Sequence, residues 1–267
     1  MPVLSRLLLL TLAVALSGCF QISSLLTVRP DGSATLRDEV TLSGFALIAL
    51  QDAAEMGDEE TEAMFDASLF EDRAAALGEG VRVVSTEISD DGYVAVYSVP
   101  DVSALRFSTP SIPSDGDDEA DGEGGPGMDE IEMSFAFNPG DPSTLRIVVP
   151  KPDAAKPGEE TEEEGSEEEM EEAVQMIGMM RSFFDDARMT VRVAVEGEIV
   201  DTTAEAGAVE GSTVTVFDVP FAAIFDVMED NPELISGAAD DEAMMDRLAE
   251  TEGVTFQRPG TVRVRFR

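Results

Sequence analysis

The chain has 267 residues with 56 acidic and 17 basic side chains, which gives a formal net charge of −39 at pH 7. A surplus of negative charge this large argues against binding to the phosphates of nucleic acids and against attachment to anionic lipids by charge alone. The sequence has no histidine and a single cysteine, so it excludes Ser–His and Cys–His catalytic pairs and leaves no second thiol for a disulfide.

The first predicted element is a signal peptide over residues 1–18. A short segment with one arginine precedes an apolar run over 7–16, and the small residues Ser17 and Gly18 then lead to Cys19. This order is typical of a secretory leader, and the apolar run is far shorter than the ~20 residues that a helix needs to cross a bilayer. The alternative is an uncleaved leader in which the cysteine is a buried core thiol.

The stretch Leu16-Ser17-Gly18-Cys19 resembles the lipobox of bacterial lipoproteins. The resemblance implies that the Cys19 thiol receives a diacylglycerol, that cleavage follows Gly18, and that the new amine is acylated, with chains such as palmitate. Two or three acyl chains give stable attachment, so the mature protein is expected to lie on a membrane without spanning it. Phe20 stands where an Asp tends to retain Gram-negative lipoproteins in the inner membrane, so the resemblance favours the outer membrane if the source is Gram-negative.

Three β-hairpins are predicted in the mature part of the chain. Each places turn residues such as Asp-Gly or Pro-Gly between two runs with strand character. In the strand over 93–99 both faces are largely apolar, which predicts a central strand covered on both sides. The paired strands are expected over 21–29 and 34–42, over 81–88 and 93–99, and over 131–137 and 144–149.

Helices and further strands are predicted around and after these hairpins. Apolar positions three and four residues apart predict two helices over 44–77, broken near Gly57-Asp58, and one helix over 170–184. Pro220 is expected to open a short helix, with Asp218 near its cap. The other predicted elements are strands over 189–195, 198–201, 212–217, 254–257 and 261–267, the short helix over 220–228, and a helix over 240–250 that is capped by Asp240.

Two acidic segments interrupt the expected domain. The first is a Gly-rich loop over 111–130, and the second is a linker over 151–168. The stretch 159–172 holds ten Glu and no cation, a composition that predicts disorder because it repels itself. We therefore expect a single lipid-anchored α+β domain over 19–267, in which antiparallel hairpins form one or two sheets packed by a few helices.

The acidic surface has two interpretations. Only Lys151 and Lys156 are lysines, and the other fifteen cations are arginines. Many carboxylates with few lysines are favoured in concentrated salt, where their repulsion is screened, so we expect the envelope protein of a halophile. The alternative is an ordinary protein whose acid is concentrated in the two segments described above.

Three stretches together resemble a broad family of uncharacterised bacterial lipoproteins, and the later part is also similar to the LppM-type lipoprotein domain. The family brings no established activity, so the resemblance implies no catalytic residues. The stretches are Cys19-Phe20-Gln21 with Asp31-Gly32-Ser33, Gly92-Tyr93-Val94-Ala95-Val96-Tyr97 with Asp101-Val102, and Gly197-Glu198-Ile199-Val200 with the strand at Ser212.

Two groups of side chains are candidates for metal or ligand binding. The first half of a calcium loop is imitated by Asp117, Glu119, Asp121 and Gly122. Met128 stands where a bidentate Glu is required, so we favour a solvated acidic loop. A methionine stripe on the predicted helix over 170–184 suits a lipid groove or Cu(I), although a core-facing stripe is favoured because no histidine completes a metal site. The stripe consists of Met170, Met176, Met179 and Met180.

A third candidate is the cationic strip formed by Arg263, Arg265 and Arg267 on the last strand. The strip suits a phosphate or a carboxylated glycan, but we expect it to pair with neighbouring carboxylates, which the chain has in excess. A pair of catalytic carboxylates stays open as an alternative, because spacing in the sequence does not locate such a pair.

Together these observations predict a lipid-anchored cell-envelope lipoprotein that acts as a non-catalytic binding or structural module. The expected site residues are Cys19, for lipidation, and Gly18, after which the signal is cleaved. No catalytic residue, cofactor or metal is expected, and the expected partners are the membrane, reached through the anchor, and a lipid or an envelope protein, with no nucleic acid. The alternatives are a carrier of a lipid or other apolar ligand and, less favoured, a carboxylate-pair hydrolase.

Overall fold

The structure is a computed structural model, and it describes residues 20–42, 65–110, 132–149, 181, 184, 186–205, 207–231 and 241–267. The lipobox, the acidic segments over 111–130 and 151–168, and the methionine stripe lie outside these residues. The predictions made for those parts therefore stay predictions.

The described strands form two sheets, which confirms the predicted α+β fold of mainly antiparallel hairpins. The larger sheet has the order β10-β11-β8-β1-β2-β4-β3, with β12 added to β11, and its neighbours are antiparallel except β1 and β8, which are parallel. Its strands are β1 (Phe20–Val28), β2 (Ala34–Leu42), β3 (Arg82–Ser89), β4 (Gly92–Val99), β8 (Arg188–Val195), β10 (Val209–Glu210), β11 (Thr213–Pro220) and β12 (Thr255–Phe256).

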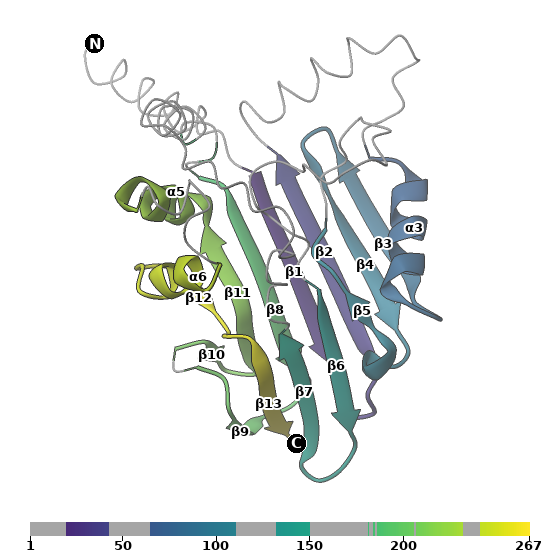
Figure 1. The fold of residues 1–267 in the computed structure, drawn as a ribbon. Coiled ribbons are helices and arrows are strands. Elements are labelled where there is room, and N and C mark those ends of the chain that lie inside the picture. The colour runs from purple at the N-terminus through teal and green to yellow at the C-terminus, as the bar shows by residue number, and fades with distance from the viewer. Residues whose placement is uncertain are drawn as a thin grey trace, which may run out of the picture.

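The smaller sheet is wholly antiparallel and has the order β5-β6-β7-β13-β9. It lies across one face of the larger sheet, toward the end where the chain terminates (Figure 1). Its strands are β5 (Arg106–Phe107), β6 (Met133–Asn138), β7 (Ser143–Val149), β9 (Ile199–Thr202) and β13 (Gly260–Phe266).

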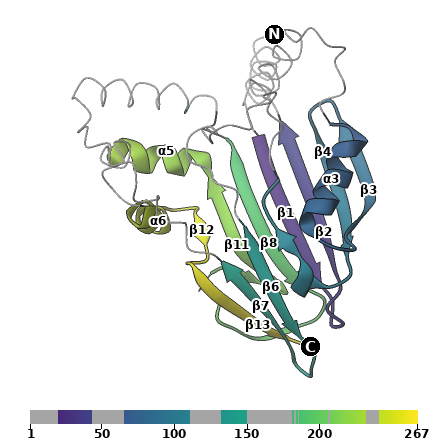
Figure 2. The same ribbon diagram turned by 45° about the vertical axis from the view of Figure 1, so that its right-hand side comes forward.

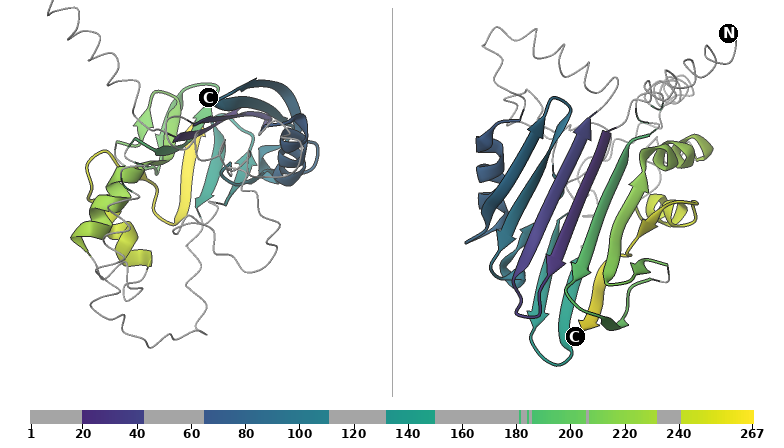
Figure 3. Two further views of the ribbon diagram at one scale, coloured as in Figure 1. Left: turned by 90° about the horizontal axis from the view of Figure 1, so that it is seen from above. Right: turned by 180° about the vertical axis from the view of Figure 1, so that it is seen from behind.

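Helices flank the smaller sheet on the same side of the larger one. Helix α3 (Ala67–Leu77) lies beside β3 and β4, while α5 (Phe221–Asp230) and α6 (Asp241–Ala249) lie at the β11 edge (Figure 2). Seen from behind, the strands of the larger sheet lie in front of these elements, so its other face is the outer face (Figure 3). A short 3-10 helix, η1 (Val102–Ala104), leads from β4 toward β5.

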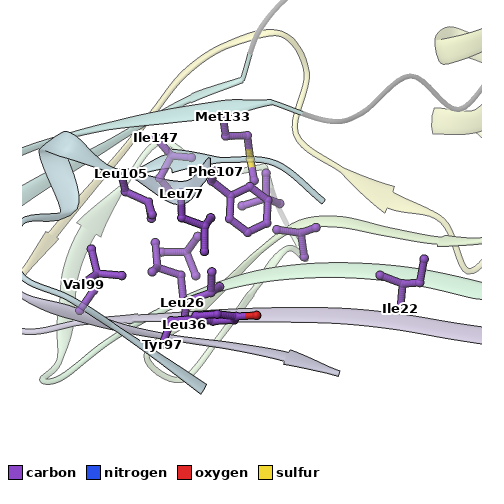
Figure 4. Close-up of a cluster of buried hydrophobic side chains, with 14 of the residues drawn as sticks. Ile22, Leu26, Leu36, Leu77, Tyr97, Val99, Leu105, Phe107, Met133 and Ile147 are labelled. Atoms are coloured by element: carbon purple, nitrogen blue, oxygen red, sulfur yellow. The ribbon is translucent and has the colours of Figure 1, made fainter. Parts of the chain in front are cut away.

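The core lies between the two sheets. Alternate residues of β1 and β2 are buried, as a strand with one covered face requires. Figure 4 shows side chains of the larger sheet, such as Leu26 and Tyr97, facing Phe107 and Ile147 of the smaller sheet. All four are at most 2% exposed, and burying each contributes about 1.5–3 kcal/mol.

The prediction that β4 is covered on both sides is wrong. Tyr93, Ala95, Tyr97 and Val99 are buried, but the alternating residues Val94, Val96 and Ser98 are only half-buried. They share the outer face of the larger sheet, because alternate residues of a strand point to opposite faces. The two residues that join the strands, Asp90 and Asp91, form the turn that the sequence predicts.

The strands expected over 189–195 and 198–201 both exist, but they belong to different sheets. β8 is part of the larger sheet and β9 of the smaller one, so the chain changes sheet at Gly197. Glu198 and Arg267 exchange backbone hydrogen bonds, at 2.9 and 3.2 Å. An added Cβ at Gly197, where φ is +142°, would lie 2.4 Å from the carbonyl oxygen of Arg267. The glycine therefore permits this close approach.

The expected helix boundaries need two corrections. The predicted span 44–77 is described from residue 65 on, and there helix α3 begins only at Ala67, capped by Asp66 through a bond from the Leu69 amide at 3.1 Å. Asp218 does not cap α5, because β11 continues to Pro220 and no side chain caps the helix that follows. Asp218 instead accepts a hydrogen bond from Arg188 at 2.6 Å.

Salt concentration should control the stability of this acidic domain. Raising the ionic strength from 0.1 M to 1 M shortens the Debye length from about 10 Å to about 3 Å, which weakens the repulsion among carboxylates. We expect the melting temperature of residues 20–267 to rise by about 5–10 °C, the shift that 2–3 kcal/mol produces in a protein of this size. Sodium and potassium chloride should act alike at equal ionic strength. A flat melting temperature from roughly 0.1 M to 2 M salt would contradict a halophilic surface.

Candidate functional site

The first candidate site is the start of β1, next to the predicted lipidation residue. Phe20 is the first residue of β1, and its side chain is 6% exposed. Its ring contacts Phe221 with centroids 4.8 Å apart and Phe184 with centroids 5.6 Å apart, both edge to face. Phe184 also packs against Phe225, at 6.1 Å. We call these four phenylalanines the aromatic cluster; each such ring pair adds about 0.5–1.5 kcal/mol beyond its burial.

The backbone at the start of β1 is fixed by its neighbours, like the side chain of Phe20. β1 lies between two partner strands from its beginning, since Phe20 is opposite Leu42 of β2 and Gln21 is opposite Arg188 of β8. The start of α5 is attached to the same place, because the Phe221 amide donates to the Ala187 carbonyl at 2.8 Å. The part of the domain that the structure describes therefore begins at Phe20, with a residue that is fixed on both sides in the sheet.

Cys19 and Gly18 themselves lie outside the described residues. Covalent geometry nevertheless limits where the cysteine is, because adjacent Cα atoms are about 3.8 Å apart across a trans peptide bond. Lipid on this thiol would thus be attached one residue before a central strand begins. The sequence predicts the position of the anchor. That β1 begins at the very next residue is shown only by the structure.

The second candidate site is a buried polar cluster on the inner face of the larger sheet, made of Ser24, Asp38, Arg73 and Ser108. Asp38 lies in the middle of β2, opposite Ser24 of β1, and is fully buried. The Ser24 hydroxyl donates to one carboxylate oxygen at 2.6 Å, and Arg73 Nε of α3 donates to the other at 3.3 Å. Arg73 also donates to the hydroxyl of Ser108 at 2.8 Å and to its carbonyl.

Burial dominates the electrostatics of this polar cluster. It raises the pKa of Asp38 above its ordinary value, and the charge of Arg73 and the hydrogen bond from Ser24 oppose the rise. The pKa values of Tyr93 and Tyr97 are raised as well, first by burial and then by the charge of Asp38. Because both oxygens of Asp38 are already bonded within the protein, the arrangement suits a structural role that attaches α3 and the residues after β5 to the sheet.

The amino-acid pattern contains one signal for this polar cluster that the predictions from the sequence missed. Leu36, Asp38 and Val40 occupy alternate positions of a predicted strand, so they share one face. An Asp between two apolar residues on the inward face needs a partner when it is buried. That signal marks Asp38, but it does not identify Arg73 as the partner.

The cationic strip is described, and the prediction that it pairs with carboxylates is confirmed. Arg263 and Arg265 lie 3.6 and 3.9 Å from the same carboxylate oxygen of Asp201, and Arg267 lies 3.9 Å from Glu198. All of these side chains are more than 40% exposed, so each pair contributes about 0–1 kcal/mol. The strip is therefore a row of exposed ion pairs along β13 and β9 and the residues next to them, Arg267 and Glu198.

The other candidate ligands, at 117–128 and in the methionine stripe, lie outside the described residues. Within the part of the chain that the structure describes, no three His, Cys, Asp or Glu side chains are grouped so that they could hold a metal ion. In the same residues, no helix is long and apolar enough to cross a membrane.

No protein-family profile matches the chain, and no curated protein matches it. Among solved structures, the chain is similar to the folded domain of the LppM protein of Mycobacterium tuberculosis, determined by NMR, with 12% sequence identity and a TM-score of 0.32. The alignment covers 94% of this chain and 92% of that one. The sequence resembles the same type of domain, but at this TM-score the likeness supports no argument about the fold or the function of this chain.

Proposed function

We propose that the protein is a lipid-anchored lipoprotein of the cell envelope that acts as a non-catalytic binding or structural module. The observation that carries the proposal is the start of β1 at Phe20, directly after the cysteine of the lipobox. A leader that is removed after Gly18 would leave the whole of the described domain intact. The proposed cleavage site thus lies before the first described residue, as the proposal requires.

The proposal of a non-catalytic role rests on the chemistry of the available side chains. The sequence has no histidine and its single thiol is the predicted lipid attachment site, so the common nucleophile and base pairs cannot form. The buried carboxylate of Asp38 has both oxygens bonded to Ser24 and Arg73, which leaves it unsuited to act as a general base. A module of this kind would work through its surfaces.

Intact-mass spectrometry of the protein purified from membranes tests the proposal. We expect a polypeptide that begins at Cys19 and carries the added mass of a diacylglycerol and an amide-linked acyl chain. An N-terminus at Met1, or a Cys19 without lipid, would contradict the proposal. An organic extract of the same sample distinguishes the carrier alternative, because a carrier would release a stoichiometric lipid that is not covalently attached.

A further inference from the structure

We propose that the lipid on Cys19 holds the Phe20 end of the larger sheet against the bilayer, so that the opposite end of the domain faces away from the membrane. This inference rests on the proposed function and adds an interaction surface and its partner, the lipid surface. We call the end at which β1 begins the proximal end, and the end with the β1–β2 and β6–β7 turns the distal end (Figure 1).

The tether between the lipid and the folded domain is short. Phe20 is buried in the aromatic cluster, and β1 pairs with β2 and β8 from its first two residues. The Cα of Cys19 lies about 3.8 Å from that of Phe20, so no flexible residues separate the acylated cysteine from the folded domain. The proposal therefore places the proximal end next to the lipid headgroups, because the anchor and the first residue of β1 are neighbours in the chain.

The tether is also attached near the middle of the proximal end. β1 is an inner strand, with β8 and β11 on one side and β2, β4 and β3 on the other. Six strands spaced about 4.8 Å apart make this end roughly 24 Å wide. A short tether near the middle of a broad end limits tilting, because a tilt in the plane of the sheet would press one flank into the bilayer.

Both flanks of the proximal end carry negative charge. The turn between β3 and β4 exposes Asp90 and Asp91, and the Leu42 amide at the end of β2 donates to the Asp91 carbonyl at 2.6 Å, which places that turn at the proximal end. On the other flank, α5 exposes Asp226, Glu229 and Asp230, and Arg181 pairs with the first two at 2.6 and 2.9 Å, so this flank stays net negative. Charged side chains resist entry into hydrocarbon, so neither flank can sink into the membrane to let the domain lie on its side.

The position of the distal end follows from the length of β1. β1 has nine residues, and the eight steps of about 3.3 Å between them place Val28, at the start of the β1–β2 turn, about 26 Å from Phe20. The β6–β7 turn lies beside it, since an added Cβ at Gly32 would meet the ring of Phe137 at 2.7 Å. The C-terminal strand β13 also ends there (Figure 1). These turns and the cationic strip are therefore presented to the aqueous phase, within reach of a partner that is not embedded in the membrane.

Energy transfer to acceptor lipids tests the orientation. In the lipidated protein Cys19 is a thioether, so Asp90→Cys and Asn138→Cys each supply a single free thiol, one exposed at the proximal end and one at the distal end. The labelled proteins are placed in phosphatidylcholine vesicles that contain a rhodamine-labelled lipid in the outer leaflet. We expect transfer from position 90 to be about twofold or more efficient than from position 138, because the two ends are about 26 Å apart.

A matched control lengthens the tether. Ten Gly and Ser residues inserted between Cys19 and Phe20 span about 16–19 Å on average, so they should remove most of the difference between the two labels. The difference in the native chain should persist in 1 M salt, because a covalent tether, unlike attraction between charges, is not screened.

Equal transfer from the two labels of a protein with verified lipid on Cys19 would overturn the orientation while leaving the proposed function intact. A difference that the inserted residues do not reduce would also overturn it, since the short tether would then not be its cause. A protein without lipid on Cys19 would overturn both proposals.

Discussion

Replacement of Arg73 by methionine should lower the free energy of unfolding by about 3–5 kcal/mol, because it leaves the carboxylate of Asp38 buried without its cationic partner. Arg73 is 14% exposed and Asp38 is fully buried, so water cannot take the place of the guanidinium. Ser24 would remain as the described donor to the carboxylate, through one of its two oxygens. Chemical denaturation of residues 20–267 in the two forms measures the difference.

Arg37 offers a matched control one residue before Asp38. It points to the opposite face of β2 and pairs with Glu39 at the surface, where both side chains are more than 40% exposed. Arg37→Met should therefore change the stability by less than about 1 kcal/mol. The role assigned to the polar cluster is wrong if the two methionine variants lose similar amounts of stability.

The loss of stability caused by Arg73→Met should also depend on pH. The pKa of Asp38 is already raised by burial, and removing the opposing charge of Arg73 raises it further. Between the pKa of Asp38 in the unfolded chain and its higher pKa in the folded protein, the folded state binds a proton that the unfolded state has released. Folding is therefore favoured as the pH falls through this range. The variant should accordingly lose less stability at pH 5 than at pH 7. Combining Asp38→Asn with Arg73→Met should recover part of the loss, because no unpaired charge is then buried.

Local signals in the sequence were sufficient for the hairpins. Asp-Gly at 91–92 and the Pro-Asp-Gly-Ser turn at 30–33 stand between strands that the structure places within one or two residues of their expected positions. Turn residues act through their own backbone preferences, so a turn can be predicted from them without knowledge of the rest of the fold. The alternation of Val262, Val264 and Phe266 with arginines on β13 could also be predicted, because the two-residue period of a strand is visible in the local sequence.

Contacts between distant segments could not be predicted in this way. The parallel pairing of β1 with β8 joins residues far apart in the sequence, and nothing local to Gln21 or Arg188 indicates it. Asp218 illustrates the same limit: its place two residues before Pro220 suggests a helix cap, whereas its partners Arg188 and Thr190 come from the neighbouring strand β8. The absence of a linker after Cys19 likewise depends on the aromatic cluster, whose members come from three separate segments.

Replacement of Cys19 by serine should have the largest effect on the protein in the cell. Serine cannot form the thioether to diacylglycerol, so we expect the membrane-bound fraction to fall from nearly all of the protein to a minor part, or the leader to remain uncleaved. Residue 19 precedes the first residue of β1, so the melting temperature of the purified domain should not change. Ser17→Ala is the matched control, because it keeps a small residue in the lipobox and leaves the thiol in place.

Fractionation of cells that produce the native chain, Cys19→Ser or Ser17→Ala tests the central claim most directly. We expect mature-sized protein in the membrane fraction for the native chain and for Ser17→Ala, and soluble or uncleaved protein for Cys19→Ser. Mature-sized Cys19→Ser protein that remains in the membrane fraction would contradict the claim that Cys19 carries the anchor.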